Sequence, residues 1–180
     1  RHKPLLITEF GGSPYADSMG NLVKQSHLGM WTGFFAEAPS CPMYWWFALT
    51  DEKRLYRRYT SLRNYSSGVD RRGLTYATRP LPGSALTIND MVGKDRYYAW
   101  LFDTTYYTSA TENLVPQVWK SIKLPVQALA PGKYKLEIWD VPKGTVAERR
   151  SLTIAPKAGP LTIPLPPFKL DIAVKLEPSK

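Results

Sequence analysis

One carboxylate lies where a strand-like segment ends and the chain must turn. Glu9 follows the apolar run Leu5–Ile7, and Gly11 and Gly12 come directly after Phe10. Glycines at such a position allow the backbone to turn away sharply, which leaves room beside the carboxylate. Glu9 is therefore a candidate for chemistry at a strand end, while its structural alternative is to cap the next helix or to pair with a lysine.

Aromatic side chains follow a second apolar run. Trp45 and Trp46 come near the end of the segment Met43–Ala48, and adjacent strand residues point to opposite faces. One indole could then stack on a flat ligand while the other packs against a helix, and core packing of both is the alternative. Tyr15 and Asp17 belong to the loop after Glu9, where substrate contacts are common.

A histidine and a cysteine complete the set of candidate residues. His27 lies on the apolar face of a predicted helix, so it is either a core histidine or a substrate contact. Cys41 is the single cysteine of the chain, which excludes an internal disulfide and a cysteine-based metal cluster. Cys41 is expected to be a small apolar filler.

The first part of the chain, residues 1–72, has the pattern of alternating strands and helices. Strands are predicted over Leu5–Glu9 and Met43–Ala48, with a helix from Gly20 to Ala38 between them. Thr50 or Asp51 is the expected N-cap of a further helix, whose buried stripe comprises Leu55, Tyr56, Tyr59 and Leu62. Alternation of this kind predicts parallel β/α units, and two such units require neighbouring strands to complete a sheet.

From about residue 80 the spacing of apolar residues changes from a mixed strand and helix pattern to short alternating segments. After the turn Pro80–Ser84, seven short alternating segments predict an antiparallel β-sandwich over residues 73–180. The predicted strands are Ala85–Ile88, Tyr97–Phe102, Trp119–Val126, Tyr134–Trp139, Val146–Ile154, Leu161–Leu165 and Leu170–Leu176.

Composition and charge limit the functional classes. The 180 residues are 43% hydrophobic and 13% aromatic, which is typical of a globular protein that buries a core. No segment is apolar over the length of a membrane span. The net charge of +9 is spread over both halves, with 11 basic against 6 acidic residues before residue 80 and 13 against 9 after it. A nucleic-acid-binding protein usually concentrates its basic residues, so we expect neither a nucleic-acid nor a membrane partner.

Five stretches, in their order along the chain, resemble a known family. The stretches KPLLITEFGG, HLGMWTGFFAEAPSCPMYWWF and LYRRYTSLRNYSSGVD are similar to the last quarter of a clan A retaining glycoside hydrolase barrel, in particular that of cellulase- and mannanase-like members. The segments LAPGKYKLEIWD and GPLTIPLPPFKLDIAVKLEP resemble the closing strands of a β-sandwich appended to such barrels. The expected fold class is α/β plus all-β: the last two β/α units of a TIM barrel, strands seven and eight, followed by a carboxyl-terminal antiparallel β-sandwich.

The resemblance implies a retaining glycosidase acting on poly- or oligosaccharide. It places the nucleophile at Glu9 and a tryptophan platform at Trp45 or Trp46, with Tyr15 and His27 as further candidates for substrate contact. Such an enzyme needs a second carboxyl group about 5–5.5 Å from the first and no metal or organic cofactor. The family's acid/base glutamate ends strand four, so it would come from an amino-terminal barrel segment, either of the same precursor or of a separate chain. The enzyme class also implies a secreted, extracellular or periplasmic protein.

A non-catalytic function is the main alternative. In that hypothesis the β-sandwich is a carbohydrate-binding or structural module. Trp100, Tyr106, Tyr107 and Trp139 could form a sugar-binding patch, or they could pack in the core and at the interface with the first part of the chain. The chain begins at Arg1 without an initiator methionine and runs at once into a strand-like segment. We therefore expect it to be the carboxyl-terminal part of a longer protein.

Overall fold

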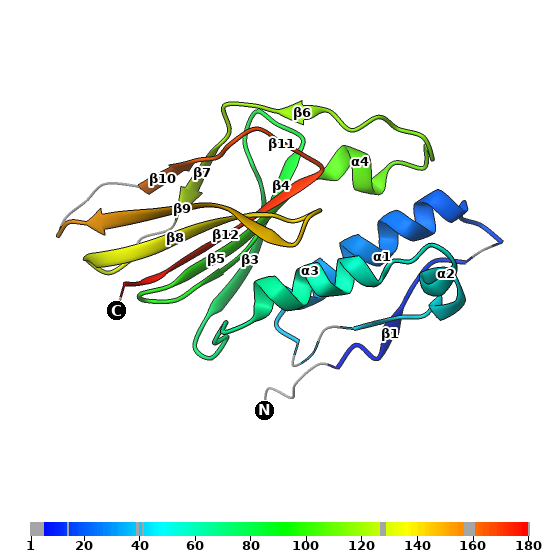
Figure 1. Ribbon diagram of the computed structural model, residues 1–180, viewed down its shortest axis with the longest axis horizontal. Coiled ribbons are helices and arrows are strands. Elements are labelled where there is room, and N and C mark those ends of the chain that lie inside the picture. Colours follow the sequence, from blue (N-terminus) through cyan, green and yellow to red (C-terminus); the bar gives the residue numbers. More distant parts are fainter. Residues whose placement is uncertain are drawn as a thin grey trace.

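The computed structural model describes residues 6–13, 15–38, 40, 42–126, 129–156 and 161–179. It has a mixed architecture in which a large antiparallel sheet carries helices on one face and short strand pairs on the other (Figure 1). None of the helices among the described residues has the length and apolar character needed to cross a membrane.

The first part of the chain contains a parallel strand pair and three helices. Glu9 lies opposite Met43 and Phe10 lies opposite Tyr44 in this pair, so the predicted parallel arrangement is confirmed. The order is β1 (Glu9–Phe10), α1 (Met19–Phe34), β2 (Met43–Tyr44), α2 (Phe47–Glu52) and α3 (Tyr56–Ser66).

Both strands are shorter than the sequence predicts. The predicted first strand, Leu5–Glu9, overlaps β1 only at Glu9, and Leu5 is outside the described residues. The predicted second strand ends at Tyr44, since the chain enters α2 at Phe47 with the Phe47 side chain 78% exposed. A short apolar run does not distinguish a buried strand from the start of a helix, and here the helix forms.

The helices differ from the prediction mainly at their ends. Ser18 caps α1, accepting a hydrogen bond from the amide of Asn21 at 3.2 Å, and the helix ends four residues before the predicted Ala38. Thr50 and Asp51 are not N-caps, because both lie inside α2. On α3 the predicted stripe is half right: Leu62 is buried, whereas Tyr56 and Tyr59 are 54% and 37% exposed.

Six strands form the main sheet, in the order β3-β4-β5-β12-β8-β9, with every neighbouring pair antiparallel. Two short pairs, β6–β11 and β7–β10, are also antiparallel. The predicted antiparallel sheet is confirmed, and β3 is a strand that the sequence pattern missed. The elements are β3 (Thr75–Pro80), β4 (Leu86–Val92), β5 (Tyr97–Asp103), α4 (Thr104–Thr108), β6 (Val118–Trp119), β7 (Lys123–Val126), β8 (Gly132–Asp140), β9 (Thr145–Ile154), β10 (Leu161–Pro164), β11 (Phe168–Lys169) and β12 (Asp171–Pro178).

The main sheet is covered on both faces, as β5 shows. Its residues Tyr97, Ala99 and Leu101 belong to the core that the sheet shares with the β7–β10 pair. The alternate residues, including Trp100, belong to a second core on the side of α1 and α3. Because side chains alternate along a strand, a strand buried on both faces must be largely apolar. β5 is aromatic or aliphatic from Tyr97 to Phe102 and ends at the buried Asp103.

The second core joins the two parts of the chain. Trp31 of α1 and Tyr65 of α3 are fully buried together with Trp100 of the sheet. The hydroxyl of Tyr65 donates a hydrogen bond to the carbonyl of Val174 in β12 at 2.8 Å. The predicted division into a domain of residues 1–72 and a domain of residues 73–180 stays a prediction, with an extensive aromatic contact across it.

Candidate functional site

The turn after β1 is held tightly. Gly11 has φ of +150°, and a Cβ atom added to it would lie 3.1 Å from the indole of Trp46. A Cβ atom on Gly12 would lie 2.0 Å from Oδ2 of Asp17 and 2.6 Å from Oε1 of Gln25. The sequence led us to expect that the two glycines leave open space beside Glu9. Instead the space beside Gly12 is filled by the side chains of Asp17 and Gln25, which would have to move to admit a Cβ atom.

Hydrogen bonds fix the same turn from both sides. The amide of Gly12 donates to Oε1 of Gln25 on α1 at 2.8 Å, and Nε1 of Trp46 donates to the carbonyl of Gly12 at 2.7 Å. Gln25 and Trp46 therefore determine how the chain leaves β1, and with it the position of Glu9.

The strand pair β1–β2 has one buried and one exposed face. Phe10 and Tyr44 pack on the buried face with their ring centroids 5.3 Å apart, and the hydroxyl of Tyr44 donates to the carbonyl of Leu22 on α1 at 2.8 Å. Burial raises the pKa of Tyr44 to about 12. Glu9 and Met43 lie opposite each other on the other face and are exposed, Met43 by 59%.

The two tryptophans occupy different environments. Trp45 lies in a bend directly after β2 and is 50% exposed. Its amide donates to the carbonyl of Phe10 at 2.8 Å, which extends the parallel pairing by one residue. Trp46 is half-buried and its ring nitrogen is used by the turn. Of the two indoles, that of Trp45 is therefore the more exposed.

The remaining candidates are not gathered at Glu9. Tyr15 is 99% exposed, and its amide is held by the hydroxyl of Ser13 at 3.3 Å. Asp17 is half-buried beside Gly12. Cys41 lies outside the described residues.

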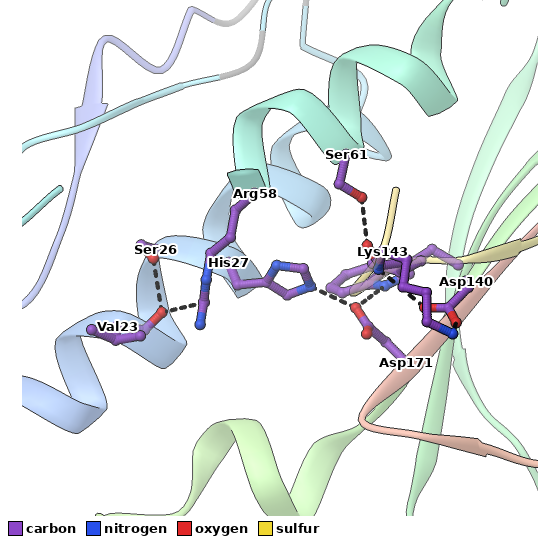
Figure 2. Close-up of polar contacts among 10 residues, drawn as sticks. Val23, Ser26, His27, Arg58, Ser61, Asp140, Lys143 and Asp171 are labelled. Carbon is purple, nitrogen blue, oxygen red and sulfur yellow. Dashed lines mark hydrogen bonds and ion pairs between the residues drawn. The ribbon is translucent and has the colours of Figure 1, made fainter. Parts of the chain in front are cut away.

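His27 belongs to the junction between α1 and the main sheet. It is 5% exposed, and its Nε2 atom lies 2.5 Å from Oδ2 of Asp171 at the start of β12. The same oxygen accepts a hydrogen bond from Nε1 of Trp100 at 3.0 Å. Figure 2 shows the imidazole of His27 pointing at Asp171 and away from the first turns of α1. These contacts fit the core-histidine interpretation of the two that the sequence left open.

The aromatic residues considered as a sugar-binding patch are core residues. Trp100, Tyr107 and Trp139 are 0%, 7% and 9% exposed and pack together with α1 and α3. Tyr106 packs edge-on against Tyr107 and lies under the ammonium group of Lys24. Core packing is confirmed for this group.

Sequence reasoning missed the acidic partner of His27. Asp171 precedes an apolar strand and gives no periodic signal of its own, so only the antiparallel pairing of β12 with β5 brings it beside Trp100. No group of three or more His, Cys, Asp and Glu side chains within the described part of the chain is placed to hold a metal ion.

The fold is similar to that of solved glycoside hydrolases. A glycoside hydrolase family 30 subfamily 8 xylanase from Clostridium acetobutylicum matches with a TM-score of 0.50 at 15% identity, over 98% of this chain and 43% of that chain. A GH30 endoxylanase from Clostridium papyrosolvens C71 gives 0.49 at 14% identity, over 98% and 42%. A GH39 enzyme from Xanthomonas axonopodis pv. citri gives 0.48 at 12% identity, over 98% and 45%.

The match to the family 30 xylanase indicates a glycosidase-related fold. The chain spans less than half the length of these three enzymes. No protein-family model and no curated protein matches it.

Proposed function

We propose that the chain is the carboxyl-terminal segment of a retaining glycoside hydrolase that acts on poly- or oligosaccharide, with Glu9 as the nucleophile. The observation that carries the proposal is the position of Glu9 on the exposed face of a parallel strand pair, beside the carboxyl-terminal ends of both strands. Active sites of (β/α)₈ barrels form at this end of the strands. The fold likeness to a family 30 xylanase supports the same assignment.

The chemistry requires two carboxyl groups. Glu9 attacks the anomeric carbon and forms a covalent glycosyl-enzyme bond, while an acid protonates the glycosidic oxygen of the leaving sugar. The same group, now a base, takes a proton from water, and the water oxygen then displaces Glu9 and releases the product. Trp45 stacks on a sugar ring beside the bond to be cleaved. The two strands of the pair contribute Glu9 alone as an acidic residue, so the acid/base comes from another segment.

That other segment also completes the sheet. In this proposal β1 and β2 are barrel strands seven and eight, α1 and α3 are the helices that follow them, and residues 73–180 are an accessory β-sandwich. The exposed face with Met43 and Trp45 would turn toward the barrel interior and be covered by the remaining strands. The partner is an amino-terminal barrel segment of the same precursor or a separate chain, and such enzymes act on substrates outside the cell.

The partner is tested by a denaturing gel and intact mass of the native protein. We expect the 20.4 kDa chain to be accompanied by, or to be continuous with, enough further chain to complete a barrel of about 250 residues. A single 20.4 kDa species that is monomeric and unfolds cooperatively would contradict the proposal.

The nucleophile is tested by replacing Glu9 in the assembled enzyme. Glu9→Gln should lower kcat on a soluble polysaccharide by about 10³-fold or more, the scale seen when a nucleophile is removed. Glu52→Gln is the matched control, because Glu52 is an exposed acid on α2 whose ion pair is with the adjacent Lys53, and it should keep full activity. Activity that survives Glu9→Gln would overturn the assignment.

The alternative hypothesis is a non-catalytic carbohydrate-binding or structural module, and the same experiments test it. Sugar binding that persists in Glu9→Gln, in a chain that is monomeric and lacks glycosidase activity, would establish it. The burial of Trp100, Tyr107 and Trp139 removes the surface on which that alternative rested.

A further inference from the structure

A pocket whose lining does not include Glu9 lies between the helices and the main sheet. Its volume is about 570 Å³, and it is formed where the link between α2 and α3 faces the turn after β8 and the start of β12. Small-molecule sites commonly enclose about 300–1,000 Å³. His27 and Asp171 line this pocket on the side of the sheet, and neither Glu9 nor Trp45 belongs to it.

The walls of this pocket carry an excess of positive charge. Lys53, Arg54, Arg57 and Arg58 line it, and Asp171 is its single acidic residue. The carboxylate of Asp171 is already bound by His27 and Trp100, and Lys53 pairs with Glu52 at the rim. Among the described residues, none of the three arginines makes an ion pair with a carboxylate.

Arg58 is the innermost of the three. Its Nη1 atom donates a hydrogen bond to the carbonyl of Val23 on α1 at 2.6 Å, and Figure 2 shows it on the same side of α1 as His27. Burial lowers the pKa of Arg58, and the neighbouring Tyr107 and Asp171 oppose that effect. Asp171 acts on Arg58 only at longer range, because Arg58 makes no direct ion pair with a described carboxylate, and burying a cation costs part of its hydration.

The backbone at Arg54 provides an independent observation. α2 ends in a Schellman motif. The amide of Leu55 donates to the carbonyl of Thr50 at 2.9 Å, and the amide of Arg54 donates to the backbone carbonyl of Asp51 at 3.0 Å. The residue in the position of Arg54 must have positive φ, here 51°, and glycine is strongly preferred there. An arginine occupies this position instead, and it lines the pocket.

We propose that this pocket binds a small organic molecule through an oxyanion group: a phosphate, a sulfate or a carboxylate. Guanidinium groups bind such oxyanions through two parallel hydrogen bonds, and three arginines supply enough donors for a multiply charged group. The apolar side of the pocket, with Leu55, Val141, Pro142 and Leu170, would contact the body of the ligand. The proposal does not depend on the glycosidase assignment, since its site and its readout are separate from Glu9.

Calorimetric titration of the full chain tests the proposal. The probes are inorganic phosphate, sulfate, citrate and glucose 6-phosphate, with glucose as the uncharged control, at a fixed ionic strength of about 0.15 M. We expect saturable binding of at least one anion and none of glucose. Tighter binding of glucose 6-phosphate than of phosphate would support an organic ligand, and equal binding would support the free anion.

Three variants separate this pocket from general attraction to a basic protein. Arg54→Gly and Arg57→Gln should each weaken binding about tenfold or more, as expected for the loss of a charge-assisted hydrogen bond. Arg54→Gly should also leave the thermal midpoint unchanged or raise it, because glycine suits the positive φ. Arg63→Gln, an exposed arginine on α3 outside the pocket, should bind as the parent does. Absence of saturable binding, or equal weakening by Arg63→Gln, would overturn the proposal.

Discussion

The strand pair β1–β2 and the six-stranded sheet differ in how completely their side chains are covered. In the sheet, every residue of β5 is buried, and Trp100 is fully enclosed between β12, α1 and α3. In the pair, Phe10 and Tyr44 are packed, whereas Glu9 and Met43 are exposed, and Trp45 directly after β2 is 50% exposed. Two-stranded pairs are marginal on their own, so β1–β2 depends on α1 beneath it. The closed region provides stability and the open face provides side chains that can meet a ligand.

The largest expected difference in the free energy of unfolding is between two variants, each with one tryptophan replaced. Trp100→Ala should lower the free energy of unfolding by about 3–5 kcal/mol, because it leaves a cavity and removes a donor from buried Asp171. Trp45→Ala should lower it by less than about 1 kcal/mol, as for other exposed positions. Chemical denaturation of both variants measures the difference, and similar costs would contradict the description of β1–β2 as open.

The pair His27–Asp171 joins α1 to the main sheet, and the interaction free energy of the pair can be measured separately. Because both groups are buried, a double-mutant cycle of His27→Ala and Asp171→Ala should give a coupling free energy of about 1–3 kcal/mol. The exposed pair Glu52–Lys53 is the matched control, with an expected coupling below about 0.5 kcal/mol. Equal coupling in the two cycles would show that the buried pair does not fasten α1 to the sheet.

The pH dependence of stability tests the packing beneath β1–β2. Burial raises the pKa of Tyr44 to about 12 in the folded protein from an ordinary value of 10. A group with a raised folded-state pKa contributes stability that is complete below its unfolded pKa and is lost as pH rises toward the folded value. The free energy of unfolding should therefore be level up to about pH 10 and fall between pH 10 and 12.

Tyr44→Phe separates this residue from the other buried tyrosines. At pH 7 it should cost about 0.5–1.5 kcal/mol, the contribution of the hydrogen bond to Leu22. Its stability should then fall less steeply above pH 10 than that of the parent. Identical slopes in the two proteins would show that Tyr44 titrates equally in the folded and unfolded states.

Adjacent tryptophans give the smallest expected effects and the sharpest comparison. In the assembled enzyme, Trp45→Ala should raise KM by roughly 3- to 10-fold, since a stacking contact contributes about 0.5–1.5 kcal/mol. Trp46→Phe should lower stability by about 1 kcal/mol instead, through the lost hydrogen bond to Gly12. A loss of stability in Trp45→Ala together with a raised KM in Trp46→Phe would contradict the roles assigned to the two rings.

The sheet could be predicted well because β8 and β9 largely alternate between more and less buried residues, and β5 is a nearly continuous apolar run. The predicted segments Tyr97–Phe102 and Tyr134–Trp139 fall within β5 and β8, and Val146–Ile154 within β9. β3 was missed because Thr75–Pro80 ends in proline and has a weakly buried pattern, as suits an edge strand.

The first part was less predictable because its strands are too short to show a period. The run from Met43 to Ala48 contains two strand residues and then enters a helix, and no sequence rule separates the two states in so few residues. The position of Glu9 opposite Met43 of β2 followed from the predicted parallel pairing. The junction of His27 with Asp171, 144 residues apart in sequence, depends on tertiary packing alone.

The most direct test of the central proposal is to trap the covalent intermediate. A 2-deoxy-2-fluoro glycoside with a good leaving group slows hydrolysis of the glycosyl-enzyme more than its formation, so the label accumulates on the nucleophile. We predict that intact mass rises by one fluoro-sugar and that peptide mapping places the sugar on Glu9. A label on another carboxylate, or an active enzyme that is never labelled, would contradict the assignment of Glu9 as the nucleophile.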